Sequence, residues 1–285
     1  MIRNEILIDE LLFYSHNRYD DNPHTGTHLH DSHEIYLLMN GQVDYFIEGN
    51  VYSVTEHDLI VTNRNELHSV IFKSGSDYER CCVRLAPMYF MEDNYKSLEN
   101  CFLHLPKGSM NIIRLNDEQL DLLLGMILKI DSLVSDRDAF ERELSIAALL
   151  LQLIIEVNRC FSQNKAEMTK ASLPEWIEGV ITYVHNCVND ESRIAEVADI
   201  AQIADRFFVN KDYLRMAFKK HTGINLFAYI QTLKIRRAKI LLGQGKSVTE
   251  TAFLCGFSDY CSFIRSFKRI CRVTPGQYAR QIRIK

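Results

Sequence analysis

The sequence predicts a two-domain α+β chain, in which a β-rich N-terminal domain carrying a helical segment is followed by an all-α C-terminal domain. Three observations predict it. Short runs rich in Val, Ile, Tyr and Phe fill residues 1–86. From residue 117 the apolar spacing changes to three and four, the period of an amphipathic helix. After residue 175 the only internal helix breaker among prolines is Pro275.

The composition fits a protein that buries real cores. The chain has 285 residues, 47% of them hydrophobic, and this length suffices for two domains. It has no run of eighteen apolar residues, so no membrane span is expected. Acidic residues at Glu5, Asp9 and Glu10 break any signal-peptide core. Eight scattered cysteines without a CxxC pair predict a reducing cytoplasm rather than a disulfide framework.

Charge is divided unequally along the chain. Residues 206–285 hold 17 Lys and Arg against three acidic residues, a formal charge of +14. The remaining 16 basic and 34 acidic residues give residues 1–205 a charge of -18. A basic block at one end of an acidic body predicts a polyanionic partner for that end only.

Short strands are expected throughout residues 1–86. Asn40-Gly41 and Gly49-Asn50 lie between apolar runs and are hairpin signals. Many short strands at such spacing predict a sandwich or a barrel. The clearest runs are His33–Met39, Val43–Ile47, Asp58–Thr62 and His68–Phe72.

Residues 117–160 are predicted to form two long helices. Asn116 is a good N-cap for the first, with Gln119 at the position that a capping box needs. The second, from Phe140 to Phe161, is apolar on nearly two faces, so both faces should be buried. One face can pack on the β domain. The other packs either on the same domain or on a second copy of the chain, and we expect this segment to dimerise.

A polar stretch divides the chain into two domains. Residues from Ser162 to Ser172 are polar, and Pro174 suits the start of the next helix, Glu175–Val188. We therefore expect one domain at 1–165, a linker at 166–174 and a second domain at 175–285.

The C-terminal domain contains an internal repeat with an offset of 49 residues. Ten residues after Asn210 match ten residues after Asp259: both stretches begin after an N-capping residue and end in Phe-Lys-Lys or Phe-Lys-Arg. Short apolar helices, Ile200–Phe207 and Val248–Leu254, precede them. Two helix-turn-helix units are predicted, joined by one helix, Phe227–Leu242, that Gly243 closes.

Here the sequence resembles the AraC family of bacterial transcription regulators over residues 175–285. The resemblance is specific because many spaced positions match at once. Phe208 and Arg272 depart from it, since both stand where glycine is usual, and Lys234 stands where the family prefers Arg. The matching positions are Tyr213, Leu214, Phe218, Lys219, Lys220, Gly223, Ala238, Lys239, Leu241, Leu242, Val248, Ala252, Gly256, Phe257, Phe263, Phe267, Lys268, Thr274, Pro275 and Tyr278.

Two such units joined by a stiff helix can enter successive major grooves, about 34 Å apart. The resemblance implies that bases are read by Lys211, Asp212, Arg215, Met216, Tyr260, Cys261, Ile264 and Arg265. Phosphate contacts are expected from Lys219, Lys220, Arg236, Lys239, Lys268 and Arg269. The alternative for these charges is a solvated helix face. Core positions are expected at Tyr213, Leu214, Phe218, Phe263 and Phe267.

Histidines near the N-terminus resemble the cupin pattern, and the AraC-family sensor domain is itself similar to a cupin. Cupins hold a divalent metal with imidazoles and a carboxylate, for which the candidates are His28, His30, Glu34 and His68. A small-molecule pocket is the preferred interpretation, lined by His28, His30, Glu34, Tyr36, Tyr45 and His68. The plain alternative is that these groups are hydrogen-bonded parts of the barrel.

The predicted function is a sequence-specific, DNA-binding transcription regulator that responds to a small molecule. Family sensors often bind sugars, although nothing in the sequence selects one. The alternative is a metal-dependent cupin enzyme or metal sensor with an appended DNA-binding domain. The sequence offers no other catalytic set, so no enzyme activity and no cofactor are expected. The expected partners are promoter DNA, the effector, a second copy of the chain and RNA polymerase, in the cytoplasm. Activation is the expected output, although the sequence does not select between an activator and a repressor.

Overall fold

The computed structural model describes residues 3–8, 11–19, 32–64, 66–72, 77–86, 90, 95–103, 111–163, 170–171, 173–271 and 273–283. They form two compact units that divide after Ala171. The strand β10 (Lys170–Ala171) pairs with β5 (Asn50–Thr55) in the first unit. Part of the stretch predicted as a linker therefore belongs to the β-rich unit.

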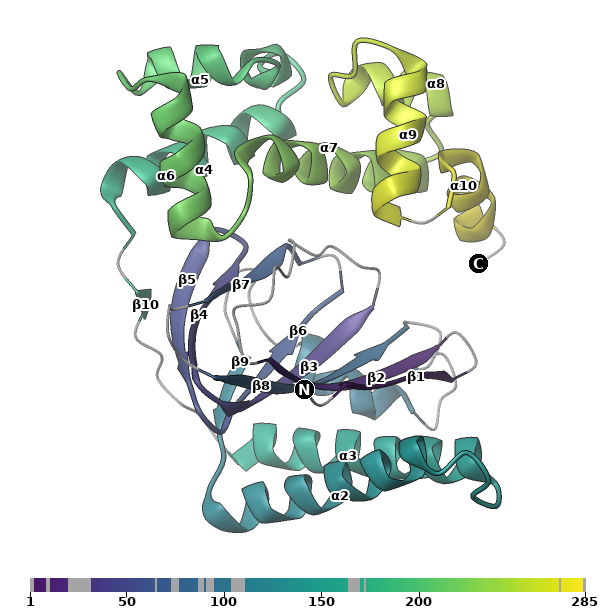
Figure 1. The fold of residues 1–285 in the computed structure, drawn as a ribbon. Coiled ribbons are helices and arrows are strands. Elements are labelled where there is room, and N and C mark those ends of the chain that lie inside the picture. The colour runs from purple at the N-terminus through teal and green to yellow at the C-terminus, as the bar shows by residue number, and fades with distance from the viewer. Residues whose placement is uncertain are drawn as a thin grey trace. The chain divides into compact units, whose positions relative to one another are not determined.

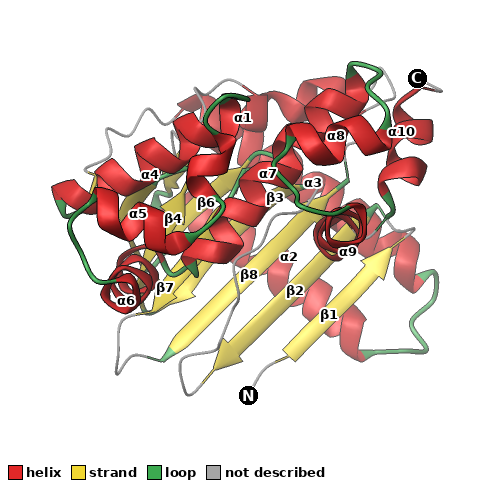
Figure 2. Cartoon of the chain, turned by 90° about the horizontal axis from the view of Figure 1, so that it is seen from above, coloured by secondary structure: helices red, strands yellow, loops and turns green. Residues whose placement is uncertain are grey.

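The first unit contains two antiparallel sheets (Figures 1 and 2). The larger has the order β1 (Arg3–Ile8), β2 (Leu12–Tyr19), β8 (Tyr78–Leu85), β3 (His33–Asn40), β6 (Asp58–Thr62) and β9 (Asn111–Arg114). The smaller has the order β10, β5, β4 (Gln42–Ile47) and β7 (His68–Phe72). These bounds confirm the four predicted strand runs to within a residue.

Gly41 makes the tight link between β3 and β4. Its φ is +105°, a backbone conformation that glycine adopts without strain. A Cβ at this position would lie 2.6 Å from the carbonyl oxygen of Asp77. The Asn40-Gly41 hairpin signal therefore has a steric cause as well as a conformational one.

The central strand β3 of the larger sheet is buried on both faces. Along β3, Tyr36 and Leu38 enter the core that the two sheets share. Ile35 and Leu37 enter a second core on the opposite face, together with residues of two long helices. This explains the continuous apolar run of β3, because side chains alternate between the faces and both faces are covered.

The helices α2 (Asp117–Ser135) and α3 (Arg142–Gln163) lie along one face of the larger sheet (Figure 1). The predicted capping box at α2 is present: Asn116 accepts from the backbone N–H of Gln119, whose side chain accepts from that of Asn116. Short helical turns at Lys96–Glu99 (η2) and Asn100–Leu103 (α1) precede β9.

The sheet covers one side of α3. The helix α3 is long and apolar enough to cross a membrane. However, its buried side chains belong to the core that this helix shares with α2 and the sheet: Ile146, Leu150, Leu153, Ile154, Val157 and Cys160.

The second unit is helical (Figure 1). Its elements are α4 (Glu175–Asn189), η3 (Ile194–Val197), α5 (Ile200–Arg206), α6 (Lys211–Thr222), α7 (Leu226–Gly243), α8 (Val248–Leu254), α9 (Tyr260–Cys271) and α10 (Pro275–Arg283). Asp199 caps α5, which agrees with the short helix predicted at Ile200–Phe207, and η3 is a separate turn before it. Gly243 lies inside α7, and the left-handed residue that follows the helix is Gly245.

Candidate DNA interface and effector pocket

The helices α6 and α9 begin in the same way. The side chain of Asn210 accepts from the backbone N–H of Asp212 at 2.8 Å. The side chain of Asp259 accepts from that of Ser262 at 2.7 Å. Both residues therefore satisfy donors that a helix N-terminus leaves unpaired, as the repeat predicts.

The two helices also bury corresponding side chains. Leu214 and Phe218 of α6 have no exposed surface, and the same holds for Phe263 and Phe267 of α9. Tyr213 is different: it is 49% exposed and stacks on Trp176 of α4, with ring centroids 5.8 Å apart. The expectation that Tyr213 is a core residue is wrong, because it lies one position around the helix from Leu214.

The eight predicted base-reading positions lie on the outward sides of α6 and α9. Met216 is 62% exposed and Tyr260 is 40% exposed. Lys211 and Ile264 are half-buried, and the other four are exposed. The structure thus brings each predicted set together on one helix, opposite its buried aromatic residues.

Cations dominate these outward sides. Arg215 pairs with Asp212 at 3.5 Å and Lys211 pairs with Asp199 at 3.3 Å, on the surface. Among the described residues of α6 and α9, the exposed cations without a carboxylate ion pair are Lys219, Lys220, Arg265, Lys268 and Arg269. In α9, Ile264, Arg265, Lys268 and Arg269 line an open surface hollow.

Two predicted phosphate contacts lie on α7 instead. Lys239 is 8% exposed, with its ammonium 5.2 Å from the ring centroid of Tyr278. It is therefore a buried residue, and we remove it from the candidate interface. Arg236 is half-buried, with Nη2 3.4 Å from Nε2 of His185.

The turns before α6 and α9 each contain a left-handed residue. In the second it is Gly256, with φ +67°. In the first it is Phe208, with φ +55° and a side chain that is 95% exposed. The first turn thus accepts a side chain where glycine is usual, because that side chain points into solvent. Arg272, the other departure, lies outside the described residues.

In the first unit, the predicted pocket residues that the structure describes face the space between the sheets. Nε2 of His68 lies 3.7 Å from Oε1 of Glu34, and the hydroxyl of Tyr45 donates to the same oxygen at 3.5 Å. The Tyr36 hydroxyl lies 2.7 Å from that of Tyr78. These residues are at most 5% exposed. His28 and His30 lie outside the described residues.

Burial and charge set the protonation of this cluster. Burial opposes a charge on His68, but the neighbouring Glu34 carboxylate raises its pKa above the ordinary value. Burial raises the pKa of Tyr36 and of Tyr45 well above 10. The described part of the chain offers no group of three His, Cys, Asp or Glu that could hold a metal. The cluster can therefore hydrogen-bond a polar ligand, and a metal role stays a prediction.

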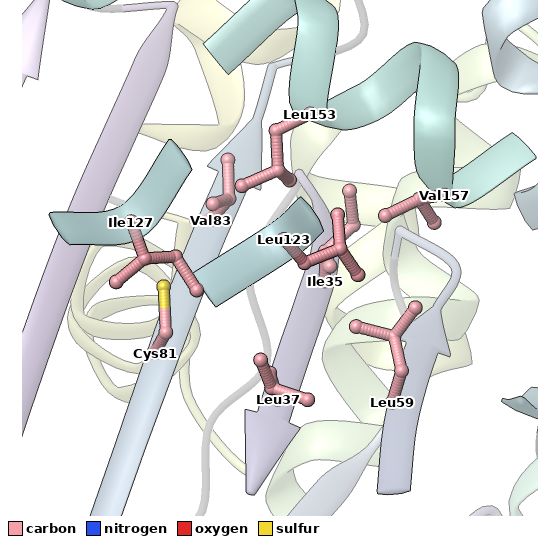
Figure 3. A pocket seen from close by; sticks show the side chains of 9 residues that line it. All are labelled: Ile35, Leu37, Leu59, Cys81, Val83, Leu123, Ile127, Leu153 and Val157. Atoms are coloured by element: carbon pink, nitrogen blue, oxygen red, sulfur yellow. The ribbon is translucent and has the colours of Figure 1, made fainter. Parts of the chain in front are cut away.

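A separate cavity lies between the larger sheet and the helices α2 and α3 (Figure 3). Its volume is about 10 Å³ and its lining is apolar, with Leu37, Cys81 and Ile127 among its walls. A space of this size and polarity stays dry. At this volume it is too small for the predicted effector.

Comparison with known families decides the identity. The family of AraC-like ligand-binding domains matches residues 11–154, about half of the chain. A helix-turn-helix domain family matches residues 203–281. The chain belongs to the AraC family. It is a DNA-binding transcription regulator with an N-terminal ligand-binding domain, as the resemblance predicts.

Relatives of this AraC-family protein cover most of its length. It is 28% identical to an uncharacterised helix-turn-helix regulator, YbfI of Bacillus subtilis, over 81% of this chain and 78% of the relative. It is 24% identical to the transcriptional activator RhaS of Escherichia fergusonii, over 85% and 83%. A fatty-acid-bound structure of ToxT from Vibrio cholerae is 15% identical over 98% and 97%, with a TM-score of 0.38. That score supports no residue-level comparison.

Several residues at this AraC-family protein's candidate sites carry no local sequence signal. Trp176 supports Tyr213 of α6 from a helix 37 residues earlier. Asn17 and Arg80 face each other across β2 and β8 on the ligand-binding unit. These two residues are 63 positions apart and come together only through strand pairing. Hydrophobic alternation and motif spacing do not predict this pairing.

Proposed function

We propose that α6 and α9 read two adjacent major-groove segments of promoter DNA through the eight outward positions named above. Phosphate contacts would come from Lys219, Lys220, Arg236, Lys268 and Arg269. The observation that carries this proposal is the matched construction of the two helices. Each has a side-chain N-cap, a fully buried pair four and eight residues after the cap, and an outward cationic side. Arg pairs well with guanine, and exposed Lys and Arg neutralise phosphates.

Selection from random double-stranded DNA with the full chain would test it. The expected result is a site with two elements and an affinity that falls steeply with salt. Arg215→Ala and Arg265→Ala should each weaken binding by about 1–3 kcal/mol and relax preference in one element only. Arg193→Ala, whose guanidinium pairs with Glu196 outside both helices, is the matched control. Unchanged base preference in both variants would refute the assignment.

We propose that the effector binds between the two sheets, against Glu34, Tyr36, Tyr45 and His68. His28 and His30 are further candidates. Four aromatic or ionisable side chains that hydrogen-bond inside a barrel suit a small polar molecule, such as a sugar. We infer regulation without catalysis, because the relatives are described as regulators.

We propose that the outward side of α3 joins two copies of the chain. Leu144 is 66% exposed and Ala148 is exposed, while Leu151 and Ile155 are only half-buried. These four residues recur at spacings of four and three, an apolar stripe that a second helix can cover. Leu144→Glu should shift sedimentation towards the monomer, whereas Phe140→Glu, 88% exposed and outside the stripe, should not. RNA polymerase is the proposed further partner, with activation in the cytoplasm as the output.

A further inference from the structure

The strands β2 and β8 place an amide opposite a guanidinium inside the barrel. Asn17 and Arg80 are directly paired in the antiparallel register, so their side chains lie on the same face. That face carries Tyr78, two residues before Arg80, which belongs to the core shared by the two sheets. Asn17 is 2% exposed.

Both side chains have a buried polar atom without a hydrogen-bond partner among the described residues. The atoms are Nε of Arg80 and Oδ1 of Asn17. Buried polar groups are nearly always paired, and an orphan is costly enough to need an explanation. The unpaired donor and the unpaired acceptor lie on facing residues of neighbouring strands, so one bound molecule could pair with both.

Charge gives the same indication. Within the described chain, no carboxylate lies within ion-pair distance of Arg80, whose guanidinium carbon is 5.9 Å from the ring centroid of Tyr36. The nearby acid, Glu34, already has His68 at 3.7 Å. The Glu34 carboxylate raises the pKa of His68 in spite of burial, so Glu34 already has a favourable partner. The half-buried guanidinium of Arg80 lacks an ion pair of this kind.

We propose that Arg80 and Asn17 form an anion subsite for the effector, which is a hydroxylated organic acid. The acid group would accept from Nε of Arg80, and a hydroxyl of the same molecule would donate to Oδ1 of Asn17. The stacked rings of Tyr19 and Tyr78, 6.0 Å apart, supply an apolar wall beside them. This inference rests on the proposed effector role of the barrel and specifies the ligand's chemical class.

The test is thermal unfolding of the full chain with defined probes. D-gluconate is compared with sorbitol, and glycerol 3-phosphate with glycerol, so that carboxylates and phosphates are distinguished and each has a neutral counterpart. One of the anions should raise the midpoint by at least about 3 °C where its polyol does not. Arg80→Met should abolish that difference. Arg84→Met, on the same strand with its guanidinium over Phe13, should keep it.

The variant without ligand gives a second readout. If Arg80 is kept for binding, Arg80→Met leaves the unfolding midpoint in probe-free buffer unchanged or raises it, because a half-buried charge with an unpaired Nε is removed. A fall of more than about 5 °C would make Arg80 a structural residue and overturn the proposal. An equal anion response in Arg80→Met would overturn the proposal as well. So would the absence of any response of the parent chain to either anion at about 50 mM, a concentration that saturates a site with a millimolar or tighter Kd.

DNA-binding measurements distinguish a failure of the anion subsite from a failure of the proposed DNA-binding function. Arg80→Met should bind the selected DNA site like the parent chain when no probe is present. If the parent chain binds the selected DNA site but shows no anion response, the anion subsite alone is refuted. Absence of specific DNA binding in the parent chain condemns the proposed function of α6 and α9 instead.

Discussion

Nζ of Lys234, buried in α7, donates a 2.9 Å hydrogen bond to the carbonyl oxygen of Gly256 in the turn before α9. On its other side Gly256 meets Ile194 of η3, where an added Cβ would lie 2.9 Å from Cγ1. Arg237, also on α7, donates to the carbonyl oxygen of Val188 at the end of α4. Side-chain contacts from both halves of the helical unit therefore fix the second motif, in addition to the connecting helix.

Gly256→Ala should destabilise the protein by about 2 kcal/mol. The substitution places a side chain at a left-handed backbone position and also against Ile194. Gly245→Ala is the matched control, because Gly245 has φ +86° but open space around its Cβ position. Urea unfolding should show a larger loss for Gly256→Ala, and Ile194→Ala should recover part of it in the double variant. Equal losses at the two glycines would mean that the contact with Ile194 is unimportant.

Phe208→Asn should stabilise the protein by about 0.5–1 kcal/mol. Asn tolerates the left-handed conformation better than a bulky side chain does, and Phe208 is 95% exposed, so little packing is lost. Phe208→Ala keeps the conformational strain and serves as the control, with a change within about 0.5 kcal/mol. A lower unfolding midpoint for Phe208→Asn would show that the aromatic ring has a contact in solution.

His16 should make stability depend on pH. Its Nδ1 lies 2.5 Å from Asp131 of α2, and its Nε2 lies 2.9 Å from Glu79 of β8. Burial opposes its charge, but the two carboxylates raise its pKa above 6.5. Because the folded-state pKa is the higher one, this stabilisation is fully present below pH 6.5 and is lost as pH rises through the folded pKa.

His16→Gln should therefore cost about 3 kcal/mol near pH 6 and progressively less at higher pH. Unfolding free energies from pH 5.5 to 8.5 give the difference between parent and variant directly. His57→Gln, at an exposed turn position next to Glu56, is the control. Tyr14 and Arg18, which contact Asp131 and Glu79, are present in both proteins, so their titration cancels in the difference. A difference in unfolding free energy that is the same at every pH would therefore contradict the role given to His16.

Local pattern was enough to predict most of the elements. The capping box at Asn116, the caps at Asn210 and Asp259, and the strand runs of β3, β4, β6 and β7 follow from neighbouring residues alone. These features depend on backbone propensity and short-range hydrogen bonds, which neighbouring residues in the sequence determine.

Long-range packing accounts for what the sequence did not predict. Lys239 reads as a surface cation, yet α7 is buried around most of its circumference and draws the side chain over Tyr278. Tyr213 reads as core, yet Trp176 from another helix covers only one side of its ring. In both cases a partner distant in sequence sets the exposure, and no local periodicity contains that information.

Trp176 should report DNA binding at the first motif. It is the only tryptophan in the chain, and it stacks on Tyr213, which directly follows the predicted base reader Asp212. Contact between α6 and DNA should change the surroundings of this stacked pair, and tryptophan emission should change in proportion to the DNA bound. Arg215→Ala should shift the titration to higher DNA concentration by about tenfold or more. Arg193→Ala should leave the midpoint in place. Emission that stays constant while a mobility shift records binding would place the first motif away from the DNA.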